Sequence, residues 1–339
     1  MSFTDQRYKT IHALQKAVLA AILLSGFSPS VLQAQQGRFL ERTLQLRAGS
    51  TFQLTNASGD ITVRGVTGRS ATIRVIKTVE EMNSADSLSL LEAAALIVEE
   101  GEESISISLR QPPAVLRGEA TPVSGSFSIE IPLDVALVLR STSGNIKVSG
   151  MEGEISLESD SGSISATDIA GYVSAGSVRG TISIEKANSG ADANTVSGDI
   201  TLTDVYSRIR ATCVSGDITI RGGVLTEIWA NNTGGDIHFD GPVVIGALYQ
   251  LTSHSGDIEF IAAEDSAFQV SLSTVSGSIS APLQLNLTGN RTSRRSLVGI
   301  IRNSDASVEL TAFSGDITLI TSSRPDRTGM IASIEEKEN

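Results

Sequence analysis

Short apolar segments recur along the chain, each at a fixed distance from a glycine. Apolar side chains stand two and four residues after these glycines, and a second apolar pair stands seven and five residues before nearly all of them. Polar residues separate the apolar positions, which is the period-two alternation of a strand with one buried face. Each repeat therefore predicts two short strands. The glycines are Gly59, Gly125, Gly144, Gly162, Gly180, Gly198, Gly216, Gly235, Gly256, Gly277 and Gly315.

The length of the repeat predicts how these strands stack. Successive glycines are 18 residues apart from Gly144 to Gly216, and the next three intervals are 19, 21 and 21 residues. Coils stacked at the ~4.8 Å spacing of paired strands would hydrogen-bond to one another and align the apolar positions into one core. The prediction is an all-β, parallel β-solenoid, similar to a β-helix or β-roll, of about eleven two-strand coils of 18–21 residues. An antiparallel sandwich or meander would also alternate, but it does not readily explain the same residue type at four fixed offsets.

Two segments interrupt the repeat and suggest a division of the chain. An N-terminal β segment, 35–122, contains a Leu- and Ala-rich stretch that predicts one short helix near 84–98, and we expect this helix to cap one end of the solenoid. The repeats themselves occupy 123–320, with an inserted loop near 285–306. Residues 321–339 lack periodicity and are expected to form a mobile tail.

The N-terminus has the pattern of an export signal over residues 1–34. Basic residues precede an apolar run at 17–24, and Ala34 offers a small residue after which cleavage would leave Gln35 first. The run is too short to cross a membrane, so no span is expected after cleavage, although an uncleaved anchor is the alternative. The predicted destination is the periplasm, the cell surface or the medium.

Composition narrows the function classes. The net charge is -12, with 38 acidic and 26 basic residues, which argues against nucleic acid as a partner. Cys213 is the only cysteine, so the chain cannot form an internal disulfide. We interpret Cys213 as a small residue within a strand, the alternative being a reactive or intermolecular thiol.

Aspartates directly after the glycines are the sharpest candidates for chemistry. Stacked carboxylates could chelate calcium or act as a catalytic pair. Other coils carry Asn, Ser or Thr at this position, and all of these residues can hydrogen-bond to the backbone of their own turn. We therefore predict a turn role, with no metal and no cofactor. This acidic ladder consists of Asp199, Asp217, Asp236 and Asp257.

The remaining polar candidates do not form a recognisable catalytic motif. His238 and His254 are interpreted as surface residues, and the position of Trp229, the only tryptophan, suggests burial or a coil edge. No catalytic residues are assigned. A cluster of arginines in the inserted loop is either a solvated loop or a contact for an anionic partner such as envelope polysaccharide or lipid headgroups. This cluster consists of Arg291, Arg294 and Arg295.

The repeated SGDI words, the exported N-terminus and the passage SFSIEIPLDVALVLRSTSGNIKVSG resemble the bacterial putative-adhesin family over about 45–320. The resemblance implies a β-solenoid in an envelope setting and no catalytic residues. We therefore expect a non-enzymatic, adhesin-like or scaffolding protein of the cell envelope that presents flat sheet faces to a polysaccharide or protein. The alternative is a carbohydrate-active β-helix enzyme of the polysaccharide lyase or hydrolase type.

Overall fold

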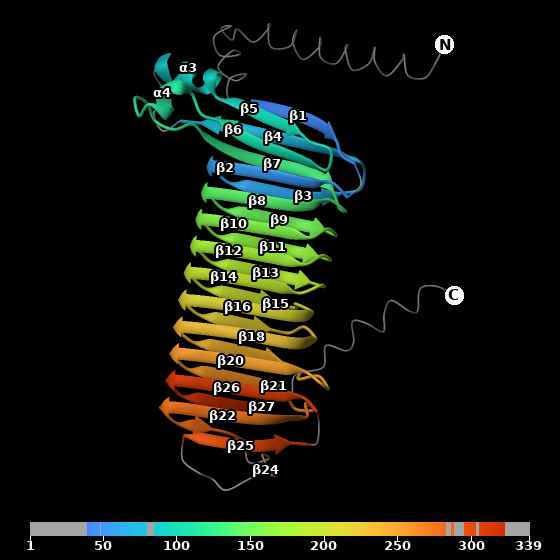
Figure 1. The fold of residues 1–339 in the computed structure, drawn as a ribbon, viewed down its shortest axis with the longest axis vertical. Coiled ribbons are helices and arrows are strands. Elements are labelled where there is room, and N and C mark those ends of the chain that lie inside the picture. The colour runs from blue at the N-terminus through green and yellow to red at the C-terminus, as the bar shows by residue number, and fades with distance from the viewer. Residues whose placement is uncertain are drawn as a thin grey trace, which may run out of the picture.

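The computed structural model describes residues 39–47, 49–79, 85–282, 286–287, 295–302 and 305–322. The expected export signal, the cleavage site after Ala34 and nearly all of the expected tail lie outside these residues. Within them, two long sheets face each other along a stack of coils, as Figure 1 shows. This architecture confirms the predicted β-solenoid.

Each coil contributes one strand to each sheet. The 13-stranded sheet is, in spatial order, β1 (Phe39–Gln45), β4 (Ser70–Thr78), β7 (Ser124–Pro132), β3 (Ile61–Val66), β9 (Ile146–Met151), β11 (Ile164–Ile169), β13 (Ile182–Ala187), β15 (Ile200–Thr203), β17 (Ile218–Arg221), β19 (Ile237–Gly241), β21 (Ile258–Ala263), β27 (Ile317–Ser322) and β23 (Ile279–Ser280). The 14-stranded sheet is β24 (Asn286–Leu287), β25 (Ser296–Ile301), β22 (Phe268–Ser276), β26 (Ser307–Ser314), β20 (Leu248–Ser255), β18 (Leu225–Gly234), β16 (Ser207–Ser215), β14 (Ala191–Ser197), β12 (Val173–Arg179), β10 (Ile155–Ser161), β8 (Ala136–Ser143), β2 (Thr51–Ser58), β6 (Ser104–Arg110) and β5 (Ala95–Glu100).

The core consists of apolar columns that run the length of the stack. Ile182 pairs with Ile164 on one side and Ile200 on the other, and all three side chains are at most 1% exposed. The opposing sheet supplies smaller residues to this part of the core, including Ala193 and Ala211. The inward phase predicted from the alternation is therefore the buried one.

The recurring glycines are required by close contact between coils. Gly198 has a φ of +134°, in the region that favours glycine, and a Cβ placed on it would lie 2.5 Å from the carbonyl oxygen of Gly180. The same contact recurs one coil further on, between Gly216 and Gly198. A side chain at this column would separate the coils.

At both ends of the stack the coils do not follow chain order. Strand β3 lies between β7 and β9, and β26 lies between β20 and β22. The first and last coils of the chain are thus each inserted between two others, as Figure 1 shows for the red strands. Because β2 and β3 belong to the continuous stack, a boundary at 122/123 does not separate two structural units.

The helical end differs in detail from the sequence prediction. Helix α3 covers Ala85–Ala93, a second helix α4 covers Pro113–Leu116, and both lie at the end of the stack that carries β1. The prediction of helix is wrong for residues 95–98, which belong to β5. β-branched residues in β5 favour a strand, and pairing with β6 satisfies their backbone groups.

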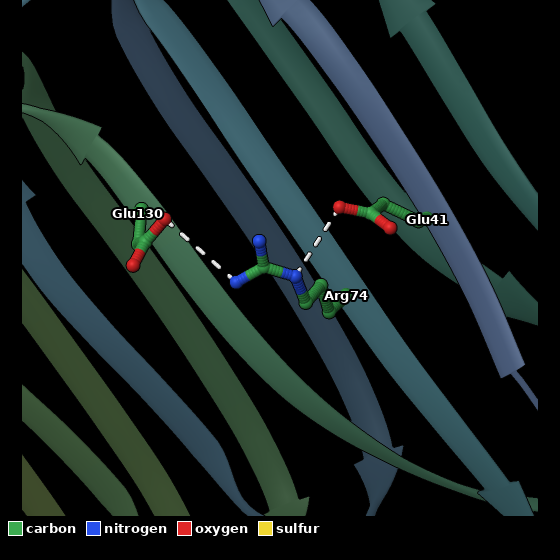
Figure 2. A network of polar contacts seen from close by, with 3 residues as sticks. All are labelled: Glu41, Arg74 and Glu130. Atoms are coloured by element: carbon green, nitrogen blue, oxygen red, sulfur yellow. Dashed lines mark hydrogen bonds and ion pairs between the residues drawn. The ribbon is translucent and has the colours of Figure 1, made fainter. Parts of the chain in front are cut away.

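One lysine and one arginine of β4, Lys77 and Arg74, contact the neighbouring elements at this end of the stack. The buried ammonium of Lys77 donates to the carbonyl oxygens of Leu91 and Ala94, which satisfies the C-terminus of α3. On the outer face, Arg74 Nε lies 3.2 Å from Glu41 Oε1 and Arg74 Nη1 lies 3.7 Å from Glu130 Oε2 (Figure 2). Because these groups are exposed, the ion pairs tie β1, β4 and β7 together only weakly.

At the opposite end, the expected loop near 285–306 is partly a strand. β25 pairs antiparallel with β22, and β24 pairs with β25. Ile301 is only 3% exposed, so this segment packs against the core. The prediction of an unstructured insertion is wrong here, because the outer edge of β22 would otherwise leave a row of unpaired backbone groups.

Candidate binding surface

The arginine cluster predicted from the sequence lies mostly beyond the described residues. Arg291 and Arg294 fall outside them, and Arg295 is exposed directly before β25. The carbonyl oxygen of Arg295 accepts a hydrogen bond of 2.9 Å from the backbone nitrogen of Thr274. The role of this cluster remains a prediction.

The acidic ladder connects coils instead of closing single turns. Asp199 Oδ1 accepts a hydrogen bond of 2.9 Å from the backbone nitrogen of Asp217, and the contact repeats from Asp217 to Asp236 and from Asp236 to Asp257. Asp316 continues the ladder beyond Asp257 because its coil is inserted there. The prediction of a bond within the same turn is therefore wrong, and each carboxylate instead helps hold the next coil in register. Among the described residues, no group of three or more acidic, His or Cys side chains is arranged to hold a metal ion.

Cys213 belongs to a buried column of small polar residues. Its neighbours across the coils are Thr195 and Asn232, and Thr195 Oγ1 donates to the carbonyl oxygen of Gly180. The Cys213 thiol lies 3.4 Å from the carbonyl oxygen of Gly198, and burial raises its pKa above the ordinary value. The position matches the structural interpretation of this cysteine.

Both histidines that the structure describes, His238 and His254, lie on strands at the surface. His238 Nδ1 is 2.7 Å from Glu259 Oε2 across β19 and β21. His254 belongs to β20 and stacks on Phe313, with ring centroids 4.8 Å apart.

The structure brings together a group of residues on β14, β16 and β18 that the sequence pattern does not single out as a site. Trp229 is 39% exposed on the outer face of the 14-stranded sheet, so burial, one of the two expectations for this residue beside a coil edge, is wrong. The guanidinium of Arg210, on the adjacent strand β16, lies 5.6 Å from the centroid of the Trp229 ring. Arg210 pairs in turn with Asp192 on β14, so an acid, a base and an aromatic ring occupy one row.

A second aromatic ring lies beside this row. Tyr172 packs against Gly190, where a Cβ would come within 3.2 Å of the ring, and Arg208 lies 5.9 Å from the ring centroid. Burial, and then the charge of Asp192, raise the pKa of the Tyr172 hydroxyl, whereas the two arginines oppose this change. The hydroxyl therefore stays protonated at neutral pH. We call this group the aromatic–arginine patch: Tyr172, Asp192, Arg208, Arg210 and Trp229.

The guanidinium groups of Arg208 and Arg210 form no close ion pair with the residues that the structure describes. Within the part of the chain that the structure describes, neither Arg208 nor Arg210 forms an ion pair within 4.0 Å, in contrast to Arg140, which lies 2.8 Å from Glu158. Both patch arginines are exposed and belong to the same face of β16. On the neighbouring strands, Arg210 stands opposite Asp192 and Arg208 stands opposite Glu227, so this surface carries charges of both signs.

A shallow groove of about 480 Å³ adjoins the patch on the same face. It crosses β10, β12, β14 and β16, and Gly176 lies within it with open space where a side chain would stand. One edge is an apolar row in which Val178, Val196 and Val214 are each about half exposed. Asn194 connects groove and patch, because its amide nitrogen donates a 2.6 Å hydrogen bond to Asp192 Oδ1. The patch and the groove therefore form one continuous surface.

A signal for this surface was present in the sequence. Asp192, Arg210 and Trp229 all stand six residues before the glycine of their coil, in the outward phase of three successive repeats. Periodicity identifies the inward columns, whereas the residue type at this outward position changes from coil to coil.

The fold and this surface define a class: a repeat protein whose outer sheet face, and not an enclosed pocket, carries the candidate site. Family models identify it further. The model of the Toastrack DUF4097 family matches residues 40–212 and 124–320, so the chain belongs to that family. No curated protein sequence matches the chain significantly. Among the described helices, neither is long and apolar enough to span a bilayer.

Three solved structures are similar over 84% of this chain. A putative cell adhesion protein from Clostridium sporogenes is 11% identical, with a TM-score of 0.23 and 100% of its chain covered. A putative lipid binding protein from Parabacteroides distasonis is 10% identical, with a TM-score of 0.42 and 97% covered. A putative adhesin from Bacteroides fragilis is 11% identical, with a TM-score of 0.30 and 97% covered.

Proposed function

We propose that this protein is a non-enzymatic binding protein of the cell envelope that holds an extended partner against the outer face of β10–β18. The observation that carries the proposal is the aromatic–arginine patch, which places the only tryptophan of the chain and two arginines beside a groove; neither arginine forms an ion pair with a residue that the structure describes. Aromatic residues and arginine are the residue types that contribute most to binding energy at protein surfaces.

The scaffold suits an extended partner better than a small molecule. The groove is open to solvent and crosses four neighbouring strands, a shape that suits an extended ligand. Parallel pairing fixes the patch residues on adjacent strands β14, β16 and β18, and little order must be created on binding. The predicted export signal agrees with an envelope setting, and the cluster of Arg291, Arg294 and Arg295 stays a separate predicted contact for an anionic partner.

The proposal is tested with purified protein on a glycan array and by co-sedimentation with insoluble envelope material. We expect binding that is lost in Trp229→Ala and kept in Thr219→Ala, a control on the outer face of the other sheet. Equal binding by both variants would show that the patch is not the binding surface.

Polysaccharides that bind are then screened for new reducing ends or unsaturated products. We expect none, because the patch offers donors, acceptors and aromatic surface but no acid–base pair assigned to a bond. Product formation from any of them would replace this proposal with the alternative of a carbohydrate-active enzyme.

A further inference from the structure

We propose that two copies of this chain pair through the outer face of the 14-stranded sheet and cover each other's aromatic–arginine patch. This inference rests on the proposed function and concerns the regulation of its site, because the second copy and the envelope partner would compete for one surface. The face consists of the outward positions of β10, β12, β14, β16, β18 and β20, which are neighbours in this order (Figure 1). We call it the six-strand face.

The six-strand face has two unlike halves. The half formed by β10, β12 and β14 contains most of the groove and contributes small residues and carboxylates, among them Gly176 and Asp192. The half formed by β16, β18 and β20 contributes the large and basic residues Arg208, Arg210 and Trp229. Because the halves differ in both bulk and charge, each is a complement for the other half of a second copy.

A two-fold axis that runs parallel to the strands, midway between β14 and β16, brings the unlike halves together. Two sheets that pack face to face lie about 10 Å apart with their strands nearly aligned. The rotation reverses the order of the coils and keeps each residue at the same distance from the glycine of its coil. Strand β14 therefore faces the partner's β16, and β12 faces the partner's β18. Such a contact uses the same surface on both copies and closes at a dimer.

Opposite charges meet across this axis. Asp192 and Arg210 stand opposite each other in register on β14 and β16, so the rotation places Asp192 of each copy over Arg210 of the other. Asp160 and His254 both stand two residues before a glycine, on β10 and β20, so Asp160 faces the partner's His254, whose ring can donate a hydrogen bond. Each of these contacts occurs twice in the dimer.

Two further carboxylates on the six-strand face do not oppose the pairing. Glu158 forms an ion pair with Arg140 of its own copy, at 2.8 Å. Glu227 stands opposite Arg208 on the neighbouring strand of its own copy. The rotation places Glu227 over the partner's Tyr172, because both stand eight residues before a glycine, and a tyrosine hydroxyl can donate to a carboxylate. The mixed charges of this surface, which would repel a polyanion in part, therefore suit a second copy.

Bulky side chains fall opposite small ones. Ser174, Asp192, Arg210 and Trp229 form one row across four strands, so Trp229 faces the partner's Ser174. Beside Ser174 lies Gly176, above which the groove of about 480 Å³ is open, and the exposed indole would fill part of this space. Two knobs and two hollows are thus matched in one dimer.

The valine row supplies an apolar strip, and the area is sufficient for a specific dimer. Val196 of each copy faces the partner's Val214, so four half-exposed valines meet beside the axis. Six strands about 4.8 Å apart, with outward positions about 6.6 Å apart, cover roughly 600–700 Å² on each copy. The pair would bury about 1,300 Å² in total, within the range of specific protein interfaces. An apolar strip among charged and polar residues is usual for interfaces that form and dissociate.

Analytical ultracentrifugation of the purified chain over a wide range of concentration tests the inference, and we expect a monomer–dimer equilibrium. Asp192→Arg and Arg210→Asp each place like charges opposite one another twice in a dimer, so each variant alone should dimerise at least about tenfold more weakly. A mixture of the two variants restores opposite charges at both contacts and should form a heterodimer with nearly wild-type affinity. Arg221→Asp, which reverses an exposed arginine of β17 on the other sheet, is the matched control and should dimerise like the wild type.

A protein that stays monomeric at every concentration, or a mixture of the two charge variants that does not recover the dimer, would overturn the pairing. If circular dichroism shows that either charge variant is misfolded, Val214→Asp serves instead. It places a carboxylate against the partner's Val196, and undiminished dimerisation of this variant would likewise overturn the pairing.

The failure of this inference differs from the failure of the proposed function. A monomeric wild type that binds envelope material, with binding lost in Trp229→Ala, would keep the proposed function and remove the dimer. A dimer that the charge variants disrupt, but that binds neither glycans nor envelope material, would keep the pairing and remove the proposed function. Where both occur, a bound glycan should shift the equilibrium toward the monomer, and binding without dissociation would overturn the regulatory role.

Discussion

The glycine column makes the strongest stability prediction, and Gly216→Ala tests it. In the wild-type protein an added Cβ would lie 2.5 Å from the carbonyl oxygen of Gly198, whereas ordinary contact begins at 3.4 Å, so the two coils would have to separate locally by about 1 Å. Two backbone bonds flank this contact, from Gly198 N to Ser215 O at 2.9 Å and from Ile200 N to Asp217 O at 2.8 Å. An opening of that size takes both beyond hydrogen-bonding distance.

The magnitude follows from these two losses and from backbone strain. Two hydrogen bonds contribute about 0.5–1.5 kcal/mol each. Gly216 has a φ of +136°, which costs a residue with a Cβ about 1–3 kcal/mol. The total is about 2–6 kcal/mol, or a fall in Tm of roughly 4–15 °C for a domain of this size.

The control is Gly176→Ala in β12, where a Cβ meets nothing within 4 Å. The free energy of unfolding of this variant should lie within about 1 kcal/mol of the wild-type value, because alanine mainly reduces the entropy of the unfolded chain. Urea unfolding followed by circular dichroism measures both. If Gly216→Ala unfolded at the same midpoint as Gly176→Ala, the close packing of the glycine column would not limit the separation of the coils.

Four further predictions concern the core, the ladder and the two ends. Ile200→Asp should lower the free energy of unfolding by several kcal/mol because it buries an unpaired carboxylate. Asp199→Asn should lower it by under ~1 kcal/mol because the amide oxygen can still accept the hydrogen bond from the backbone nitrogen of Asp217. A calcium-dependent rise in Tm that Asp199→Asn abolished would refute this structural role. Lys77→Met should cost about 1–3 kcal/mol in urea unfolding, since the carbonyls of Leu91 and Ala94 at the C-terminal end of α3 lose their donor. Burial lowers the pKa of Lys77 below its ordinary value, and the charge of Glu92 opposes this. Folding therefore disfavours the charged form of Lys77. The stability of the wild type relative to Lys77→Met should rise with pH between the lowered pKa of folded Lys77 and about 10.4, the pKa of an unperturbed lysine. The absence of this slope would refute the pKa shift. Cys213 should react with a thiol reagent only on unfolding, because it is 1% exposed and its pKa is raised; labelling at the rate of a free thiol in native protein would show local opening. Deleting residues 288–304 should preserve the β-type circular dichroism, since β22 still pairs with β26. The deletion should lower the midpoint of urea unfolding because β25 is lost. An unchanged midpoint would mean that β25 does not stabilise this end of the stack.

The repeat predicted the interior of the fold because one physical rule governs every coil. Ile200 is buried for the same reason as Ile182 and Ile218, and Gly198 is required by the same contact as Gly216. The candidate surface obeys no such rule. Asp192, Arg210 and Trp229 occupy one outward offset with three different chemistries, so periodicity alone could not identify them. Their significance comes from pairing across strands, which requires the register of the coils to be known.

The ends were the least predictable part, and the reason is the repeat itself. A coil with the same glycine, the same inward columns and the same ladder residue can pair with any other coil, so the columns do not specify which coils are neighbours. The connections make that choice. The segment between β3 and β7 is long enough to place β7 beyond β3, and the segment between β23 and β26 likewise lets β26 pair between β20 and β22. Each terminal coil is then paired on both sides, and antiparallel strands cover the exposed edges, β4 on β7 and β25 on β22. Insertions that interrupt the periodicity in the sequence thus stop the stack from fraying, or from pairing with another molecule, at its open ends.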